Sequence, residues 1–413
     1  MSNIEHDTED EPTTAGASAS ESPSAGGDSP SAEGDSRDNV LDVSGLTKIY
    51  PDGTLAVDDI SFSIREGDFC VIIGPSGCGK STTLHSLVGK VEATEGTVEL
   101  GGEDITETNT YDRDIGLVFQ DFQLFPHLNV EENIRYGLER IDLPESEIQQ
   151  RLDDIIEMMR LKGSEERDPM ELSAGQKQRV ALARSLVLEP RLLLLDEPLG
   201  DMDYKLQKHM EQELLRIHRE FDTTMVYVTH DQTQAMRLAD QVVVMNDGKI
   251  EQSESVNRTY NKPATAFVAT FVGDSNIFNG TVTEISDDGK LAHVETDLGT
   301  FVASTDNLKS PPSDAVGTDL SFNVRPQHLS LDGAGENEIE CRVEDIITHV
   351  GQGTQVLLEP VDDDSMEFQL LNRELISDLD ETVTVSWSSR DTVLLEETSV
   401  VEGVDLQRDI LGE

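Results

Sequence analysis

The chain has 413 residues and few basic side chains: 31 Lys and Arg stand against 83 Asp and Glu, a net charge of −52. Because a nucleic-acid backbone requires a basic face on its partner, this shortage argues against unaided binding to nucleic acid. The first 40 residues contain ten acids and one base, so a charge of −43 belongs to the rest of the chain. We interpret this excess as an adaptation to a high-salt cytoplasm. The alternative is an ordinary acidic protein with a disordered acidic tail.

Cysteines and long apolar runs are also scarce. Cys70, Cys78 and Cys341 are odd in number and lack the spacing of metal ligands, so we expect reduced thiols in a cytoplasm. The apolar runs are short, with four residues in Leu192 to Leu195 and five in Phe69 to Ile73, whereas a membrane span needs roughly 18. The acidic N-terminus has no apolar segment of the kind found in secretory signals.

Composition and periodicity divide the chain into three parts. Residues 1–38 are rich in Ser, Gly, Pro and acids, which predicts a disordered acidic tail. In residues 39–270, strand-like blocks such as Phe69–Ile73 alternate with helical ones such as Glu145–Leu161, which predicts a parallel α/β core. In residues 271–413, short alternating segments separated by turn residues predict a small β-domain.

A glycine-rich segment follows the predicted strand Phe69–Ile73 and precedes a helical stretch that starts at Thr82. It reads Gly74-Pro75-Ser76-Gly77-Cys78-Gly79-Lys80-Ser81, which fits the pattern G-x-x-x-x-G-K-[ST]. Glycines let successive backbone N–H groups surround phosphates, and the helix directs its positive end at them. We expect Lys80 to reach the β- and γ-phosphates of a nucleotide and the Ser81 hydroxyl to bind Mg²⁺. The alternative is a chance glycine-rich turn.

The apolar strand Leu192–Leu195 ends in Asp196 and Glu197. We expect Asp196 to hold the Mg²⁺ shell and Glu197 to be a candidate base for the attacking water. By itself, a strand that ends in two acids is weak evidence for a nucleotide site. Together with the phosphate loop 116 residues earlier, it is strong evidence for one.

A third motif, Leu172-Ser173-Ala174-Gly175-Gln176, precedes the helical run Lys177–Leu188. A hydroxyl and backbone N–H groups at a helix N-terminus can form a second anion site. The alternative is a plain helix N-cap.

The order of these three motifs resembles that of the nucleotide-binding subunits of ABC transporters, from about Leu41 to Thr270. The resemblance implies an α/β P-loop NTPase cassette, with a RecA-like core, an antiparallel β part and a helical subdomain at about residues 121–190. It implies that ATP and Mg²⁺ bind, and that two copies assemble head to tail. Each ATP would then lie between the phosphate loop of one copy and Ser173–Gln176 of the other.

The resemblance also assigns roles to single residues. Tyr50 would stack on adenine, Gln120 would sense Mg²⁺, the water and the membrane partner, and His230 would contact the γ-phosphate. The implied nucleotide-binding set is Tyr50, Gly74, Pro75, Ser76, Gly77, Cys78, Gly79, Lys80, Ser81, Thr82, Ser173, Ala174, Gly175, Gln176 and Asp203. The implied catalytic residues are Glu197, His230 and Gln120, and the implied metal ligands are Ser81, Gln120 and Asp196.

Two positions depart from the family's commonest pattern. Ala174 stands in place of a glycine, and we expect function to survive this change because Gly175 remains. Gly200-Asp201-Met202 stands in place of Ser-Ala-Leu, and its extra charge puts coupling between the two ATP sites in doubt.

The carboxyl end resembles the TOBE-type β-domain of importer ATPases in Asn246–Gln252, Ala266–Gly273 with Asn276, and Val324–Leu331. This implies a subunit held at the cytoplasmic face of the membrane by permease subunits, to which the segment from Gln120 to Val130 would dock. An extracytoplasmic substrate-binding protein would act indirectly. The cargo is open among sugars, polyamines, ferric iron, molybdate and thiamine, with polyamines and ferric iron favoured over sugars. The β-domain either binds a regulatory ligand or, as we favour, enlarges the dimer contact.

Two rival functions keep the cassette fold. One is a soluble ABC ATPase of DNA repair or translation with no transport role. The other is a regulator that binds nucleotide without turnover, which the presence of both Glu197 and His230 argues against.

Overall fold

A computed structural model describes residues 38–199, 204–308, 310–331, 333–349, 353–363, 366–376 and 379–395. The predicted disordered tail, residues 1–38, lies outside these ranges except for its last residue. No helix in the described ranges is long and apolar enough to cross a membrane.

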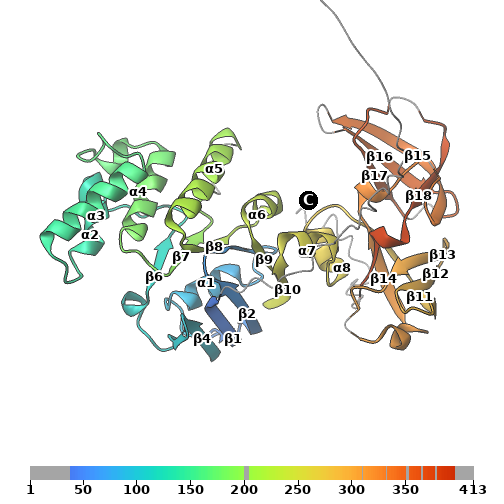
Figure 1. Ribbon diagram of the computed structural model, residues 1–413, viewed down its shortest axis with the longest axis horizontal. Helices are drawn as coiled ribbons and strands as arrows, with labels where there is room; N and C mark the ends of the chain where they lie inside the picture. Colours follow the sequence, from blue (N-terminus) through green and yellow to red (C-terminus); the bar gives the residue numbers. More distant parts are fainter. Residues whose placement is uncertain are drawn as a thin grey trace, which may run out of the picture. The chain divides into compact units, whose positions relative to one another are not determined.

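A six-stranded sheet in the order β10-β9-β3-β8-β7-β6 forms the centre of the first domain (Figure 1). Its strands are β3 (Phe69–Ile73), β6 (Ile115–Val118), β7 (Leu192–Asp196), β8 (Thr224–Val228), β9 (Gln241–Asn246) and β10 (Lys249–Ser255). All neighbours are parallel except β9 and β10. The predicted parallel core is therefore confirmed.

The central strands β3, β7 and β8 are almost entirely apolar, because both faces of the sheet are covered. All five residues of β3 are buried, and they alternate between two hydrophobic cores. Phe69, Val71 and Ile73 belong to one core, and Cys70 and Ile72 to the other. The alternation follows from the two-residue period of a strand.

An antiparallel sheet covers one side of the core, in the order β2-β1-β4-β5. Its strands are β1 (Asn39–Ile49), β2 (Leu55–Arg65), β4 (Glu95–Leu100) and β5 (Glu103–Asp104). Helix α1 (Lys80–Leu87) shares its hydrophobic core through Leu84, which packs with Val57 and Ile60. The helix begins two residues earlier than predicted, because Gly79 is its N-cap.

The helices on the other side are α2 (Val130–Leu138), α3 (Glu145–Met158), α4 (Ala174–Leu186), α5 (Tyr204–Phe221) and α6 (Gln232–Leu238). Helices α2, α3 and α4 contact one another and form a helical layer (Figure 1). The amphipathic helix predicted from residue 145 is confirmed and ends at Met158, because Arg160 adopts a left-handed conformation with φ 55°.

Two short helices, α7 (Val256–Asn261) and α8 (Ala266–Phe271), lead into the β-domain. This domain contains a closed barrel, β11-β12-β13-β19-β14, and a second sheet, β17-β16-β15-β18 (Figure 1). The strands are β11 (Asn276–Ile285), β12 (Leu291–Thr296), β13 (Gly299–Ser304), β14 (Asp319–Val324), β15 (Asn337–His349), β16 (Gly353–Pro360), β17 (Phe368–Asn372), β18 (Thr382–Trp387) and β19 (Thr392–Leu395). Short 3-10 helices occur at Thr110–Asp112, Pro169–Glu171, Pro312–Ala315, Pro326–His328 and Ser389–Asp391.

The barrel and the second sheet share one aromatic core. Phe278 lies between both, with ring centroids 4.7 Å from Phe322, 4.9 Å from Phe368 and 5.5 Å from Trp387. The predicted architecture, an α/β cassette followed by an all-β domain, is confirmed.

Candidate functional site

The phosphate loop connects the buried end of β3 to the first turn of α1. Glycine is required at two of its positions by close backbone contacts. A Cβ on Gly74 would lie 2.2 Å from the Met245 carbonyl oxygen, and one on Gly79, where φ is 103°, would lie 2.4 Å from that of Ala56. Ser76 and Gly77 are exposed at the loop tip, so the backbone N–H groups are accessible to phosphate.

Lys80 lies within this loop and is only 6% exposed. Its Nζ donates to the carbonyl oxygens of Gly74 and Pro75, each at 2.8 Å. A phosphate would therefore compete with backbone acceptors for an ammonium that the loop already holds in position. Burial is the main cause that raises the pKa of the Cys78 thiol, so this loop cysteine is expected to be a poor nucleophile.

Tyr50 lies beside the start of α1. Its hydroxyl is 3.4 Å from Thr82 Oγ1, and the Lys48 ammonium is 5.4 Å from its ring centroid. An aromatic face therefore adjoins the phosphate loop, where the family resemblance implies adenine stacking.

The two acids at the end of β7 and the histidine that follows β8 meet because the two strands are parallel neighbours. Asp196 pairs in register with Val228, whose carbonyl accepts a hydrogen bond from Glu197 N at 3.1 Å. His230 Nδ1 then lies 3.5 Å from Glu197 Oε1. Glu197 has φ 42°, an uncommon conformation for a non-glycine residue that often marks functional sites.

Asp196 is partly buried at the tip of β7. Burial is the main cause that raises the pKa of its carboxyl group; the nearby His85 lowers it and Glu197 raises it further. His85 belongs to none of the sequence motifs, because its contact with Asp196 joins residues far apart in the chain.

Gln120 is exposed, two residues beyond β6. The loop after it contains Phe122 and Gln123, both with positive φ, and both carbonyls accept from Arg184 of α4, at 3.0 and 2.8 Å. Arg184 thus fastens the Gln120 loop to the helix that follows the third motif. No sequence motif marked this role.

The third motif is a genuine helix N-cap. The backbone N–H of Gln176 donates to Ser173 Oγ at 3.4 Å, and that of Ser173 donates to Gln176 Oε1 at 3.0 Å. This capping box starts α4 at Ala174, three residues before the predicted start. Ala174 is thus a helical residue, which tolerates a methyl group, whereas a Cβ on Gly175 would lie 3.2 Å from Met210 Sδ.

The structure brings only part of the predicted site together. The phosphate loop, Tyr50, Asp196, Glu197 and His230 are linked through α1, β7 and β8. The third motif belongs to the helical layer, since α4 contacts α2 and α3. Asp203 and Gly200-Asp201-Met202 lie outside the described residues.

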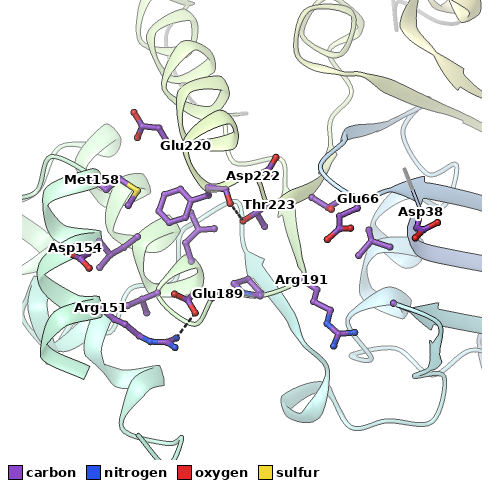
Figure 2. Close-up of a pocket in the computed structure, with 18 of the residues that line it drawn as sticks. Asp38, Glu66, Arg151, Asp154, Met158, Glu189, Arg191, Glu220, Asp222 and Thr223 are labelled. Atoms are coloured by element: carbon purple, nitrogen blue, oxygen red, sulfur yellow. Dashed lines mark hydrogen bonds and ion pairs between the residues drawn. The ribbon is translucent and has the colours of Figure 1, made fainter. Parts of the chain in front are cut away.

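A cavity of about 750 Å³ lies at the opposite edge of the sheet (Figure 2). Its walls include Glu66, which precedes β3, Arg191, which precedes β7, and Thr223, which precedes β8, so it opens at the amino ends of the strands. Because the phosphate motifs follow the carboxyl ends, this cavity is not the nucleotide site.

Comparisons with known proteins agree with this geometry. Residues 57–200 match the family model for ABC transporter, and residues 322–395 match that for TOBE domain. The spermidine/putrescine import ATP-binding protein PotA of Rubrobacter xylanophilus is 39% identical over 355 residues, which is 86% of this chain and 93% of that protein. The Fe(3+) ions import ATP-binding protein FbpC of Photobacterium profundum is 38% identical over 310 residues, 75% and 85% of the two chains.

Among solved structures, cbiO1 from Clostridium perfringens, part of the ABC transporter complex cbiONQ, is similar with a TM-score of 0.50 and 30% identity. The match covers 54% of this chain and 90% of that one. Fold and site together define an ATP-binding protein of the P-loop class. The chain belongs to the family of ABC transporter ATP-binding proteins that carry a TOBE domain. The family predicted from the three motifs is confirmed.

Proposed function

We propose that this chain is the ATP-hydrolysing subunit that energises an ABC importer. The main support is the meeting of the phosphate loop, Asp196, Glu197 and His230 at one edge of the sheet, in a chain whose relatives named above are import ATP-binding proteins. Those relatives favour transport over a role in DNA repair or translation. The 3.5 Å approach of His230 to Glu197 favours turnover over a purely regulatory role.

The chain's own groups carry the proposed steps. The loop N–H groups and Lys80 hold the β- and γ-phosphates, and Glu197 accepts a proton from the attacking water. His230 contacts the γ-phosphate, and its Nδ1 holds the side chain of Glu197. Gln120 joins the site from the neighbouring strand end of β6.

Mg²⁺ fits the oxygen donors at this edge. Magnesium sites in such enzymes use one or two protein oxygens and complete the shell with phosphate oxygens and water. The Ser81 hydroxyl and the Asp196 carboxylate provide these donors, with Gln120 as a third. The ion would offset the charge that develops on the phosphates.

A second copy of the chain completes each site. Ser173 and Ala174 are exposed at the N-terminus of α4, a helix of 13 residues in a different layer from the phosphate loop. We infer head-to-tail assembly in which this N-terminus binds the ATP held by the partner copy, with Asp203 near the interface. ATP binding then shifts the population towards the closed dimer, and hydrolysis releases it.

The segment from Gln120 to Val130 is proposed to dock to the permease subunits. Asn133 gives it a defined shape by accepting from Phe125 N at 2.8 Å and by donating to the carbonyls of Phe125, Leu128 and Asn129. The subunit then lies at the cytoplasmic face of the membrane, served indirectly by a substrate-binding protein. From the names of its relatives we propose a polyamine or ferric iron as cargo, and residues 39–270 and 271–413 as the two domains.

Replacement of Glu197 tests the catalytic assignment. E197Q should retain ATP binding and lose about 10² to 10⁴-fold in phosphate release, the usual contribution of a general base. Glu189 is a matched control, because it also has a positive φ, 53°, and pairs with Arg151 at the edge away from the site. E189Q should hydrolyse ATP normally. Wild-type turnover in E197Q would refute the role of Glu197.

Replacement of Lys80 tests the phosphate loop. K80A removes the ammonium and should weaken ATP binding itself in an equilibrium titration at high salt. Unchanged affinity would contradict the proposed cradle.

A further inference from the structure

His85 lies one helical turn after Ser81 on α1, so both side chains project from the same face of that helix. Its side chain is 22% exposed, but the Nε2 atom is buried and has no hydrogen-bond partner among the residues that the structure describes. This atom lies 3.6 Å from Asp196 Oδ2. A buried polar atom without a partner is unfavourable and calls for an explanation.

The backbone holds His85 in this place. Its carbonyl accepts from the N–H groups of Lys90 and Val91, at 2.9 and 3.1 Å, so the chain wraps around the end of α1. Arg113 donates to the next two carbonyls, those of Ser86 and Leu87, at 3.0 and 2.7 Å. The last turn of α1 is thus fixed, and with it the backbone position from which the imidazole reaches Asp196.

A carboxylate that binds a cation needs its other oxygen held by a donor. Hydrogen bonds from outside the ligand set orient such ligands and strengthen metal binding. Asp196 is only partly exposed, which limits how far water can provide this donor. The unpartnered nitrogen of His85 faces it.

We propose that His85 is a positioning residue for the metal ligand Asp196: its Nε2–H donates to Oδ2 and directs the other carboxylate oxygen towards the Mg²⁺ that accompanies ATP. This inference rests on the proposed function of Ser81 and Asp196 as magnesium ligands. A charge-assisted hydrogen bond of about 2.7–2.9 Å requires an approach of under about 1 Å from the present distance, which rotation of the Asp196 side chain can supply.

Two substitutions of His85 separate positioning from packing. H85L keeps a side chain of similar size and removes the donor, whereas H85Q places an amide N–H at a similar reach. His218 is a matched control, because it is also partly buried and its Nε2 lies 3.0 Å from the Gly67 carbonyl at the other edge of the sheet. H218L removes a comparable ring away from the site.

The measurement is Mn²⁺ binding, followed by electron paramagnetic resonance in the presence of a non-hydrolysable ATP analogue. Binding of the analogue is also titrated in EDTA. H85L should bind Mn²⁺ about tenfold more weakly, the typical effect of losing a group that orients a metal ligand. Its affinity for the analogue in EDTA should stay within about twofold of wild type. H85Q should lie within about threefold of wild type for Mn²⁺, and H218L should match wild type.

The proposal would be overturned if H85L bound Mn²⁺ as tightly as wild type. It would also be overturned if H85L lost as much affinity for the ATP analogue in EDTA as it lost for Mn²⁺, or if H85Q bound Mn²⁺ no more tightly than H85L. If the wild-type protein itself bound no Mn²⁺, the proposed magnesium site would be refuted. That result differs from all of those that concern His85 alone, so the two failures can be told apart. If H85L does not fold, H85N replaces it, since its amide is one methylene shorter than that of H85Q. Weak Mn²⁺ binding by H85N with recovery in H85Q would support the proposal, and equal binding by both would refute it.

Discussion

Arg325 joins the β-domain to the helices that precede it. It is 2% exposed, and its guanidinium donates to the carbonyl of Tyr260 twice, at 3.2 and 2.8 Å. It also donates to the carbonyls of Ala269, Gly273 and Asp274, at 2.6, 2.9 and 2.9 Å. We predict that R325M strongly destabilises the β-domain, because it removes all of these bonds while keeping an apolar stem.

The expected loss of stability depends on two opposing contributions, the hydrogen bonds of the guanidinium and the cost of burying its charge. Each hydrogen bond from a charged donor contributes about 1.5–3 kcal/mol, but burial of the charge cancels much of that gain. The variant also leaves buried carbonyls without donors, and each buried acceptor that loses its donor costs about 1–3 kcal/mol. We therefore expect a loss of about 3–5 kcal/mol in the free energy of unfolding.

Trp387 provides a selective probe of this unfolding. It is the only tryptophan of the chain and is buried in the β-domain core, 5.2 Å from the ring of Phe301. Its fluorescence should be followed during urea unfolding at constant high salt. For an m-value of about 2 kcal/mol per M, the midpoint should fall by about 2 M. R325K should give a smaller fall, because a lysine keeps the charge but has fewer donors.

The exposed Arg390 lines the same small cavity as Arg325 and is the matched control. R390M should change stability by less than about 0.5 kcal/mol, as is usual for surface positions. An R325M midpoint within about 0.3 M of wild type would refute the view that this arginine couples the domain to α7 and α8.

Two other predictions concern charge. Glu213 of α5 is 6% exposed and lies 3.0 Å from Arg160, 3.1 Å from Arg216 and 3.9 Å from Arg179. Burial raises its pKa, but the arginines outweigh burial and the net pKa is lowered, so the carboxylate stabilises the fold above its unfolded pKa near 4.3. E213Q should therefore lose about 3 kcal/mol in the free energy of unfolding at pH 7, measured by circular dichroism. The difference from wild type should shrink as the pH falls below about 4.3 and disappear below the lowered pKa of the folded state. A difference that does not change with pH would contradict this. ATPase activity and dimer closure should need molar salt, and full activity at low ionic strength would refute the high-salt interpretation.

Local patterns were sufficient to predict the elements that carry the nucleotide motifs. The apolar residues of β3 and β7 could be recognised because they are continuous runs, and the phosphate loop because its glycines have fixed spacing. The start of α4 was predicted three residues late. A capping box depends on side chains that bond to backbone, and Ser173 and Gln176 indicate it only by their spacing.

Contacts between distant residues could not be predicted in the same way. His85 meets Asp196, and Arg184 meets the carbonyls of Phe122 and Gln123, only after the sheet and the helical layer have formed. The left-handed conformation of Glu197 is equally invisible in the sequence, because glutamate has no preference for positive φ. Such features arise from tertiary packing, and they cluster around the site.

Four of the scarce basic residues have a common use that bears on the net charge. Lys80, Arg113, Arg184 and Arg325 all donate to backbone carbonyls at loops and helix ends. Apart from the exposed bond from Arg184 to the Gln123 carbonyl, these contacts are partly or fully buried, and salt screens buried contacts far less than exposed charges. The excess acids therefore lie mainly on the surface, where two copies of the chain would approach each other in the assembly proposed above. As the salt concentration falls, assembly of the closed dimer should therefore weaken before ATP binding to the phosphate loop of a single copy does.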